Sequence, residues 1–139
     1  VGLADPQALL QATAARDAVL AIGMPEAMLS ILQAVAYTAL APKSNSLYRA
    51  WKLINEDIKK HPDLPVPMQL RNAPTRLMKE TGYGDGYRYA HDSEVPVTGM
   101  QCMPDALAGS SYYHPVPYGF EKKLQQVMER IADLKSKKQ

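Results

Sequence analysis

The chain has 139 residues, and its 16 lysines and arginines nearly balance its 14 aspartates and glutamates, for a formal net charge of +2. So small a net charge does not by itself require a polyanionic partner such as nucleic acid. Hydrophobic residues make up 46% and charged residues 22%, which predicts one globular domain and excludes a disordered chain. No apolar run approaches the ~18 residues of a membrane-spanning helix, so we expect no membrane partner.

The cysteine content and the first residues bear on the cellular compartment and on where the chain starts. Cys102 is the only cysteine, which excludes an intrachain disulfide and fits a reducing cytoplasm. The first six residues lack the basic start and apolar run of a signal peptide. The chain begins with Val1 rather than methionine, which favours a start inside a longer protein.

Two helices joined by a short turn are expected in the first 40 residues. Asp5-Pro6 is a good helix start and Gly23 a good stop, so the first helix should end at Ile22. Pro25 should open the second, which runs to about residue 40. Its broad apolar stripe predicts burial on most sides: Met28, Ile31, Leu32, Val35, Ala36 and Ala39.

A third helix is predicted over residues 46–60, after a loop at residues 41–46. Four large apolar residues recur at helical spacing and are expected to face the core, and the same residues are candidates for a contact between subunits. They are Leu47, Trp51, Ile54 and Ile58.

The next segment is irregular. His61 to Pro67 holds three prolines and predicts an extended connector, and Pro74 can open a short helix to about Thr81. Residues 83–118 have room for a small hairpin that pairs residues 87–89 with 95–103, although prolines limit any sheet.

The last helix is predicted over residues 120–135. A two-heptad seam is formed by Phe120, Leu124, Val127, Ile131 and Leu134. Packing on the chain's own domain and contact with a partner subunit are equally consistent with so short a seam. The predicted fold is therefore mainly α, a bundle of about five helices with one long irregular segment, divided into residues 1–62 and 63–139.

No motif carries catalysis. The chain has no phosphate-binding G-x-x-x-x-G-K-[ST] loop, and the glycines of residues 82–86 lack the strand and helix that would frame one. His91-Asp92 resembles a metal-ligand pair, but further ligands on helices are missing, so a structural histidine is favoured. Cys102 has no feature that would lower its pKa, so a buried structural thiol is expected. We expect no catalytic residue, cofactor or metal.

Six of the eight tyrosines lie in the irregular segment. Tyrosines beside cations can stack single-stranded bases, or pack loops onto a core with their hydroxyls in water, and packing is the favoured interpretation. The candidate DNA contacts are Lys43, Arg71, Arg76, Lys79 and Arg88.

Short sequence motifs that occur in the same order in one protein family are found over nearly the whole chain. They begin with residues 1–9 and 22–27 and end with Gly119-Phe120-Glu121-Lys122-Lys123. With these matches the chain resembles the RarA/MgsA family, the replication-associated recombination protein A family, which includes the Werner-helicase-interacting ATPases. The motif residues between these ends are Pro42, Lys43, Ser44, Asn45, Arg71, Asn72, Gly86, Tyr87, Tyr89, His91, Asp92, Pro104, Tyr112 and Tyr113.

The resemblance implies a clamp-loader-like carboxy-terminal domain that assembles an AAA+ ATPase into homotetramers. It implies that ATP and Mg²⁺ bind upstream of Val1, and that DNA and single-stranded-DNA-binding protein are partners at stalled replication forks, in a nucleoid-associated cytoplasmic protein. Two alternatives stay open: a stand-alone helical module that binds single-stranded nucleic acid, and a small hydrolase built around His91 and Asp92.

Overall fold

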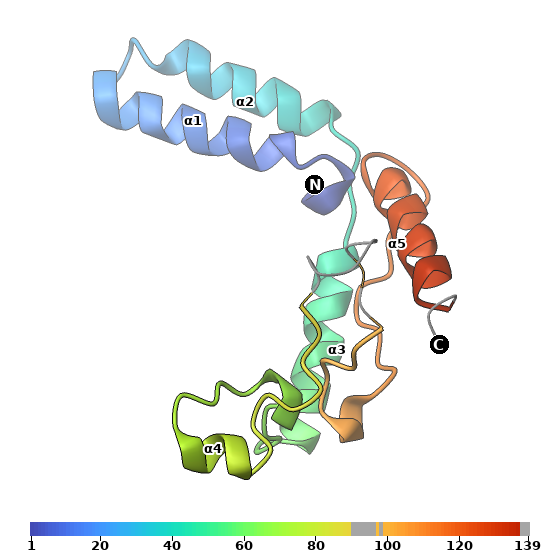
Figure 1. Cartoon of the computed structure of the whole chain (residues 1–139). Coiled ribbons are helices and arrows are strands. Elements are labelled where there is room, and N and C mark those ends of the chain that lie inside the picture. Colours follow the sequence, from blue (N-terminus) through green and yellow to red (C-terminus); the bar gives the residue numbers. More distant parts are fainter. Residues whose placement is uncertain (90–96, 98, 137–139) are drawn as a thin grey trace. The chain divides into compact units, whose positions relative to one another are not determined.

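The computed structural model describes residues 1–89, 97 and 99–136. Over these residues the chain forms five α-helices, joined by loops and short 3-10 turns, and no strand (Figure 1). The mainly helical prediction is confirmed. Residues 87–89 are not a strand, whereas most of the proposed partner strand, including Val95 and Pro96, lies outside the described residues.

The chain divides into two compact units that each combine separate stretches of sequence. One unit contains residues 1–55 and 112–127, and the other contains residues 56–111 and 128–139. Both α3 (Ser46–Lys60) and α5 (Glu121–Ser136) therefore begin in the first unit.

Helices α1 (Gln7–Ile22) and α2 (Met28–Leu40) form a hairpin in the first unit. The Asp5 carboxylate accepts the Gln7 N–H at 3.0 Å, as expected of a residue that precedes a helix. Gly23 ends α1 with a φ of 74°, a left-handed value that glycine adopts without strain. Helix α2 starts three residues later than Pro25 predicts, because the Ala27 and Met28 N–H groups bond to Gly23 and Pro25 in a separate turn.

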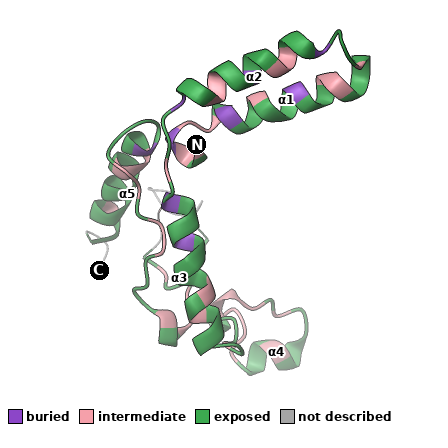
Figure 2. Ribbon diagram, turned by 180° about the vertical axis from the view of Figure 1, so that it is seen from behind, coloured by how far each residue is buried: buried purple, intermediate pink, exposed green. Residues whose placement is uncertain are grey.

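Small residues form the interior of this hairpin. Ala8, Ala15 and Ala34 are the buried residues of α1 and α2, and Ala27 in the turn between them is fully covered (Figure 2). Alanine lets two helix backbones approach closely, so larger side chains are displaced to the outside of the pair. On α2, Leu32 is 53% and Val35 is 56% exposed, so the expected burial of α2 on most sides is wrong for this chain taken alone.

Helix α3 has the bounds predicted from sequence, but a different face is buried. Its buried residues are Ser46 and Ala50, one helical turn apart. The apolar stripe lies beside this small-residue face, so the expectation that it faces the core is wrong. The stripe residues are exposed: Leu47 by 47%, Trp51 by 60%, Ile54 by 38% and Ile58 by 58%.

The remaining helices follow the predicted order. Helix α4 (Arg76–Glu80) begins after Thr75, whose hydroxyl oxygen accepts the Met78 N–H at 3.3 Å and so caps the helix. The short 3-10 turns at Met68–Leu70 and Asp105–Leu107 belong to the same unit as α4.

Candidate functional site

Glu121, the first residue of α5, is a fully buried carboxylate in the first unit. Its Oε1 accepts the Ser46 hydroxyl at 2.7 Å, and its Oε2 accepts the Val116 N–H at 2.9 Å. The Ser44 and Tyr113 side chains also interact with it. We call this group (Glu121, Ser44, Ser46, Tyr113 and the Val116 amide) the Glu121 cluster.

Two opposing effects set the charge state of the cluster. Burial acts to raise the pKa of Glu121, but hydrogen bonds from Ser46, Ser44 and the Val116 amide outweigh burial and hold the pKa below its ordinary value. The same burial, with the neighbouring Glu121 charge, raises the pKa of Tyr113. Glu121 is also the first residue of α5, a position where the helix dipole favours a carboxylate.

The lowered pKa of Glu121 predicts how stability depends on pH. A carboxyl group with a lowered pKa in the folded chain stabilises it fully above the unfolded pKa of about 4.3, and less as pH falls through the folded value. We expect the stability difference between wild type and Glu121→Gln, measured by urea denaturation, to shrink between neutral pH and about pH 3. A difference that stays constant over this range would contradict the prediction.

The amino-terminal segment is bound to the same part of the fold. The Val1 carbonyl accepts the Ser44 N–H at 3.0 Å, and the Ala4 carbonyl accepts the Phe120 N–H at 2.8 Å. Gly119 makes this approach feasible, because a Cβ there would lie 2.3 Å from the Ala4 oxygen. The cluster and these bonds therefore join three segments distant in sequence. At 0% exposure the Glu121 carboxylate is closed to a substrate, so its role here is structural.

Lys43, a candidate DNA contact, lies at the end of α2. Its ammonium donates to the carbonyls of Thr38 at 2.8 Å and Ala39 at 3.3 Å, and to that of Ala41. A cation at the carboxy-terminal end of a helix is favoured by the helix dipole. The Tyr118 hydroxyl donates to the Lys43 carbonyl at 2.9 Å. The DNA contact stays a prediction, and the geometry gives Lys43 a capping role.

In the second unit Arg71 is the centre of a smaller cluster. Its guanidinium carbon lies 5.2 Å from the centre of the Tyr83 ring, a cation–π contact. Its Nε donates to the Val66 carbonyl at 2.7 Å, and one terminal nitrogen donates to the Tyr83 hydroxyl at 3.3 Å. Arg71 thus joins the proline-rich connector to the turn after α4.

The other predicted site residues are spread over the fold. The structure brings Ser44 and Tyr113 together at the Glu121 cluster, while Tyr112 is half-buried and Asn45 accepts the Arg49 N–H of α3 at 3.0 Å. Along α5, Leu124 is half-buried and Val127 is 52% exposed. His91 and Asp92 lie outside the described residues. Exposed residues are Pro42, Asn72, Arg76, Lys79, Gly86, Tyr87, Arg88, Tyr89 and Ile131, and Pro104 is half-buried.

Within the described residues, no group of three or more metal-ligating side chains occurs. Over the same part of the chain, each helix is too short or too polar to cross a lipid bilayer. Cys102 is an exposed free thiol rather than the buried thiol expected from the sequence.

Sequence reasoning did not single out Glu121 as a site residue. The signal was present, because Glu121 directly follows Gly119-Phe120 in a family motif and precedes two lysines at the start of a predicted helix. An acidic residue at that position is common on helices for electrostatic reasons alone, so its burial could not be inferred from local pattern.

Over the described residues the chain is thus a mainly helical fold in which a buried carboxylate joins segments that are distant in sequence. Residues 1–132 match the family model for the MgsA AAA+ ATPase C-terminal region, so the chain belongs to this family.

Curated relatives agree with the family match. The chain is 45% identical over 135 residues to replication-associated recombination protein A of Coxiella burnetii, covering 96% of the chain and 31% of that protein. It is 44% identical over 134 residues to the Escherichia coli protein of the same name, covering 96% and 30%. An ATPase of Dictyostelium discoideum, WRNIP1, is 43% identical over 115 residues, covering 81% and 13%. The chain thus spans about a third of the two bacterial relatives.

Proposed function

We propose that this chain is the self-association region of an AAA+ ATPase and assembles as a homotetramer. The supporting observation is the contrast between its interior and its surface. Among the described residues, those that are apolar and buried are all alanines, whereas many leucine, isoleucine, valine and tryptophan side chains on α1, α2 and α3 are exposed. Exposed apolar surface of this extent is unusual for a monomer and typical of an interface.

In this proposal the chain positions copies of a catalytic part that lies elsewhere in the parent protein. That part binds ATP and Mg²⁺ and acts in replication-associated recombination at stalled forks, in a nucleoid-associated cytoplasmic protein. DNA and single-stranded-DNA-binding protein are the parent's partners. The names of the bacterial relatives, which are replication-associated recombination proteins, support this role.

The stripes on α3 and α5 are the sequence-derived candidates for subunit contacts. The exposure of Trp51, at 60%, and of Val127, at 52%, leaves both stripes accessible to a partner. A closed tetramer with dihedral symmetry needs more than one kind of contact, so one stripe need not supply the whole interface.

The purified 139-residue chain is expected to assemble without nucleotide or DNA. Light scattering at micromolar concentrations should give four times the chain mass of 15.3 kDa. The stable contacts should each bury more than ~1,000 Å². A strictly monomeric mass over a hundredfold concentration range would refute self-association by this region alone.

A second candidate function, binding of single-stranded nucleic acid, is favoured by the exposed cations and tyrosines of the second unit. Arg76 and Lys79 lie one turn apart on α4, and Arg88 stands between the exposed Tyr87 and Tyr89. Cations that neutralise phosphates, together with rings that stack bases, make a surface suited to single strands.

This second function predicts a salt-dependent affinity. Binding of a fluorescent single-stranded oligonucleotide should weaken steeply as salt rises, and Arg88→Ala should reduce the slope of log affinity against log salt by about 0.7. Lys52→Ala, an exposed lysine on α3, is the control and should leave the slope unchanged. Binding that is absent at low salt would remove this candidate.

A further inference from the structure

The two sides of the α1–α2 hairpin differ in chemistry. Along one side, polar side chains bridge the helices: Gln33 Nε2 donates to Gln11 Oε1 at 3.0 Å, and the Tyr37 hydroxyl donates to Asp5 at 2.8 Å. These bonds satisfy the polar groups within the chain. The same side also holds a hollow of about 400 Å³, lined by Tyr37 and Leu40 among others, so its paired polar groups are what distinguish it.

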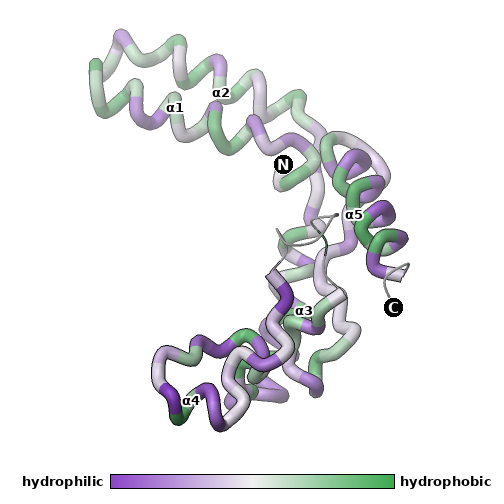
Figure 3. Tube along the Cα trace, in the orientation of Figure 1, coloured by the Kyte–Doolittle hydropathy of each residue, from purple (hydrophilic) through white to green (hydrophobic). Residues whose placement is uncertain are grey.

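The other side is an open apolar groove. A hollow of about 330 Å³ lies between the helices, lined among others by Ala12 and Val19 of α1 and by Ile31 and Val35 of α2. The groove stays open because the helices meet through Ala15 and Ala34, whose side chains are too short to fill it. Hydrophobic stretches recur along both helices in Figure 3.

A second apolar hollow extends the groove toward the amino-terminal end of α1. It has a volume of about 390 Å³ and is lined by Leu3, Leu9 and Leu47 among others. Thr38 lines both hollows, so they adjoin. We call this continuous side of the hairpin the apolar seam.

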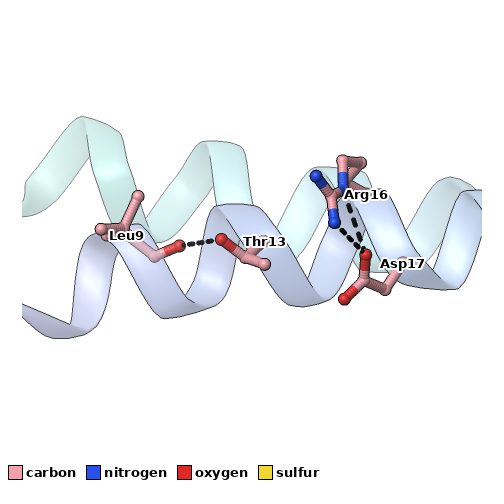
Figure 4. Close-up of polar contacts among 4 residues, drawn as sticks. All are labelled: Leu9, Thr13, Arg16 and Asp17. Atoms are coloured by element: carbon pink, nitrogen blue, oxygen red, sulfur yellow. Dashed lines mark hydrogen bonds and ion pairs between the residues drawn. The ribbon is translucent and has the colours of Figure 1, made fainter.

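Charge is almost absent from the apolar seam. Helix α2 contains no charged residue, and Arg16 carries the one charged side chain that lines the groove within the described part of the chain. Its guanidinium donates to the Asp17 carboxylate at 2.8 and 3.0 Å, as Figure 4 shows beside Leu9 and Thr13. Both charges belong to the same chain, so a partner need not supply a counter-charge.

We propose that the apolar seam packs against the same seam of a second copy of this chain. This inference rests on the proposed self-association and names one of its contacts. A charged partner would lose hydration at this seam without gaining an ion pair, whereas a second copy brings an equally uncharged surface. The exposed leucines that border the seam, such as Leu9 at 73%, supply the side chains to fill the facing groove.

The size of the seam suits such a contact. Helices of 16 and 13 residues give a face about 20 Å long, and two helix diameters make it about 20 Å wide. Because its side chains make the face uneven, its accessible surface is on the order of several hundred Å². This is close to the ~600 Å² that each partner buries at the lower end of stable interfaces. Exclusion of water from facing leucines and valines supplies the driving force.

Charge substitution on the two sides of the hairpin tests the proposal. Leu9→Glu and Val35→Glu place a carboxylate on the seam, and both positions are exposed, so the isolated fold should tolerate them. Each variant is expected to lower the mass found by light scattering at least twofold at micromolar concentration, with unchanged helical circular dichroism. Leu10→Glu and Leu29→Glu, both exposed and outside the lining of these hollows, are the matched controls.

The outcomes separate this contact from self-association in general. Loss of mass only in the seam variants supports the seam contact. Seam variants that keep the wild-type mass, while Trp51→Glu or Val127→Glu dissociates the chain, would overturn the seam contact and leave self-association standing. A wild-type chain that is monomeric throughout would overturn both.

Discussion

Replacing Glu121 by alanine is expected to lower the free energy of unfolding by about 3 kcal/mol. Alanine removes both acceptors and leaves the Ser46 hydroxyl and the Val116 N–H without the partners they have at 2.7 and 2.9 Å. Each buried donor left unsatisfied costs about 1–3 kcal/mol. Urea denaturation at pH 7 measures the loss.

Glu121→Gln tests the contribution of the negative charge, because it changes the shape of the side chain very little. Glutamine keeps the volume and one acceptor oxygen, but its amide nitrogen cannot accept the second hydrogen bond. We expect a loss of about 1–2 kcal/mol, intermediate between wild type and alanine. Glu56→Gln, an exposed glutamate on α3, is the control and should change stability by less than about 0.5 kcal/mol. Equal stabilities for the Glu121 and Glu56 variants would show that the buried carboxylate contributes nothing.

Replacing Gly119 by alanine is expected to cost about 3 kcal/mol, for two independent reasons. The φ of 60° at Gly119 is a left-handed conformation, which costs a residue with a Cβ about 1–2 kcal/mol. The new Cβ would also lie 2.3 Å from the Ala4 oxygen, so the backbone must shift and the bond from the Phe120 N–H to that oxygen must lengthen or break.

Gly109→Ala is the matched control for backbone conformation. Gly109 has a φ of 78°, but a Cβ there meets no atom within 4 Å. Its substitution should therefore cost only the conformational part, about 1–2 kcal/mol. Thermal or urea denaturation of both variants isolates the steric part by subtraction. If the two substitutions cost the same, the close packing of Ala4 on Gly119 is not significant for stability.

Measurements of self-association test the exposed surface, which the Glu121 and Gly119 substitutions do not alter. The Glu121 cluster and the Gly119 contact lie inside the first unit, whereas the apolar seam is exposed on the hairpin. A seam variant should therefore change mass with little change in the unfolding of the isolated chain. A Glu121 variant should change unfolding first, and mass only where the fold is lost.

The sequence by itself determined where the helices are and to which family the chain belongs. The stop at Gly23 and the bounds of α3 follow from local chemistry, because glycine, proline and capping residues act on the backbone within one turn. The ordered motifs identified the family in the same way, since they are a property of the linear chain, and the match over residues 1–132 confirms it.

Only the tertiary structure decided which side chains are buried. The apolar stripe of α3 predicted core residues, yet Ser46 and Ala50 are the buried residues of this helix. Burial depends on which other segments pack against each face of the helix. From the sequence, Glu121 is an ordinary residue at the start of a helix. Only the fold places it against Ser46, 75 positions away in sequence. Periodicity shows that a helix has an apolar face. Contacts between distant segments determine whether that face meets the chain's own core or remains exposed for a partner.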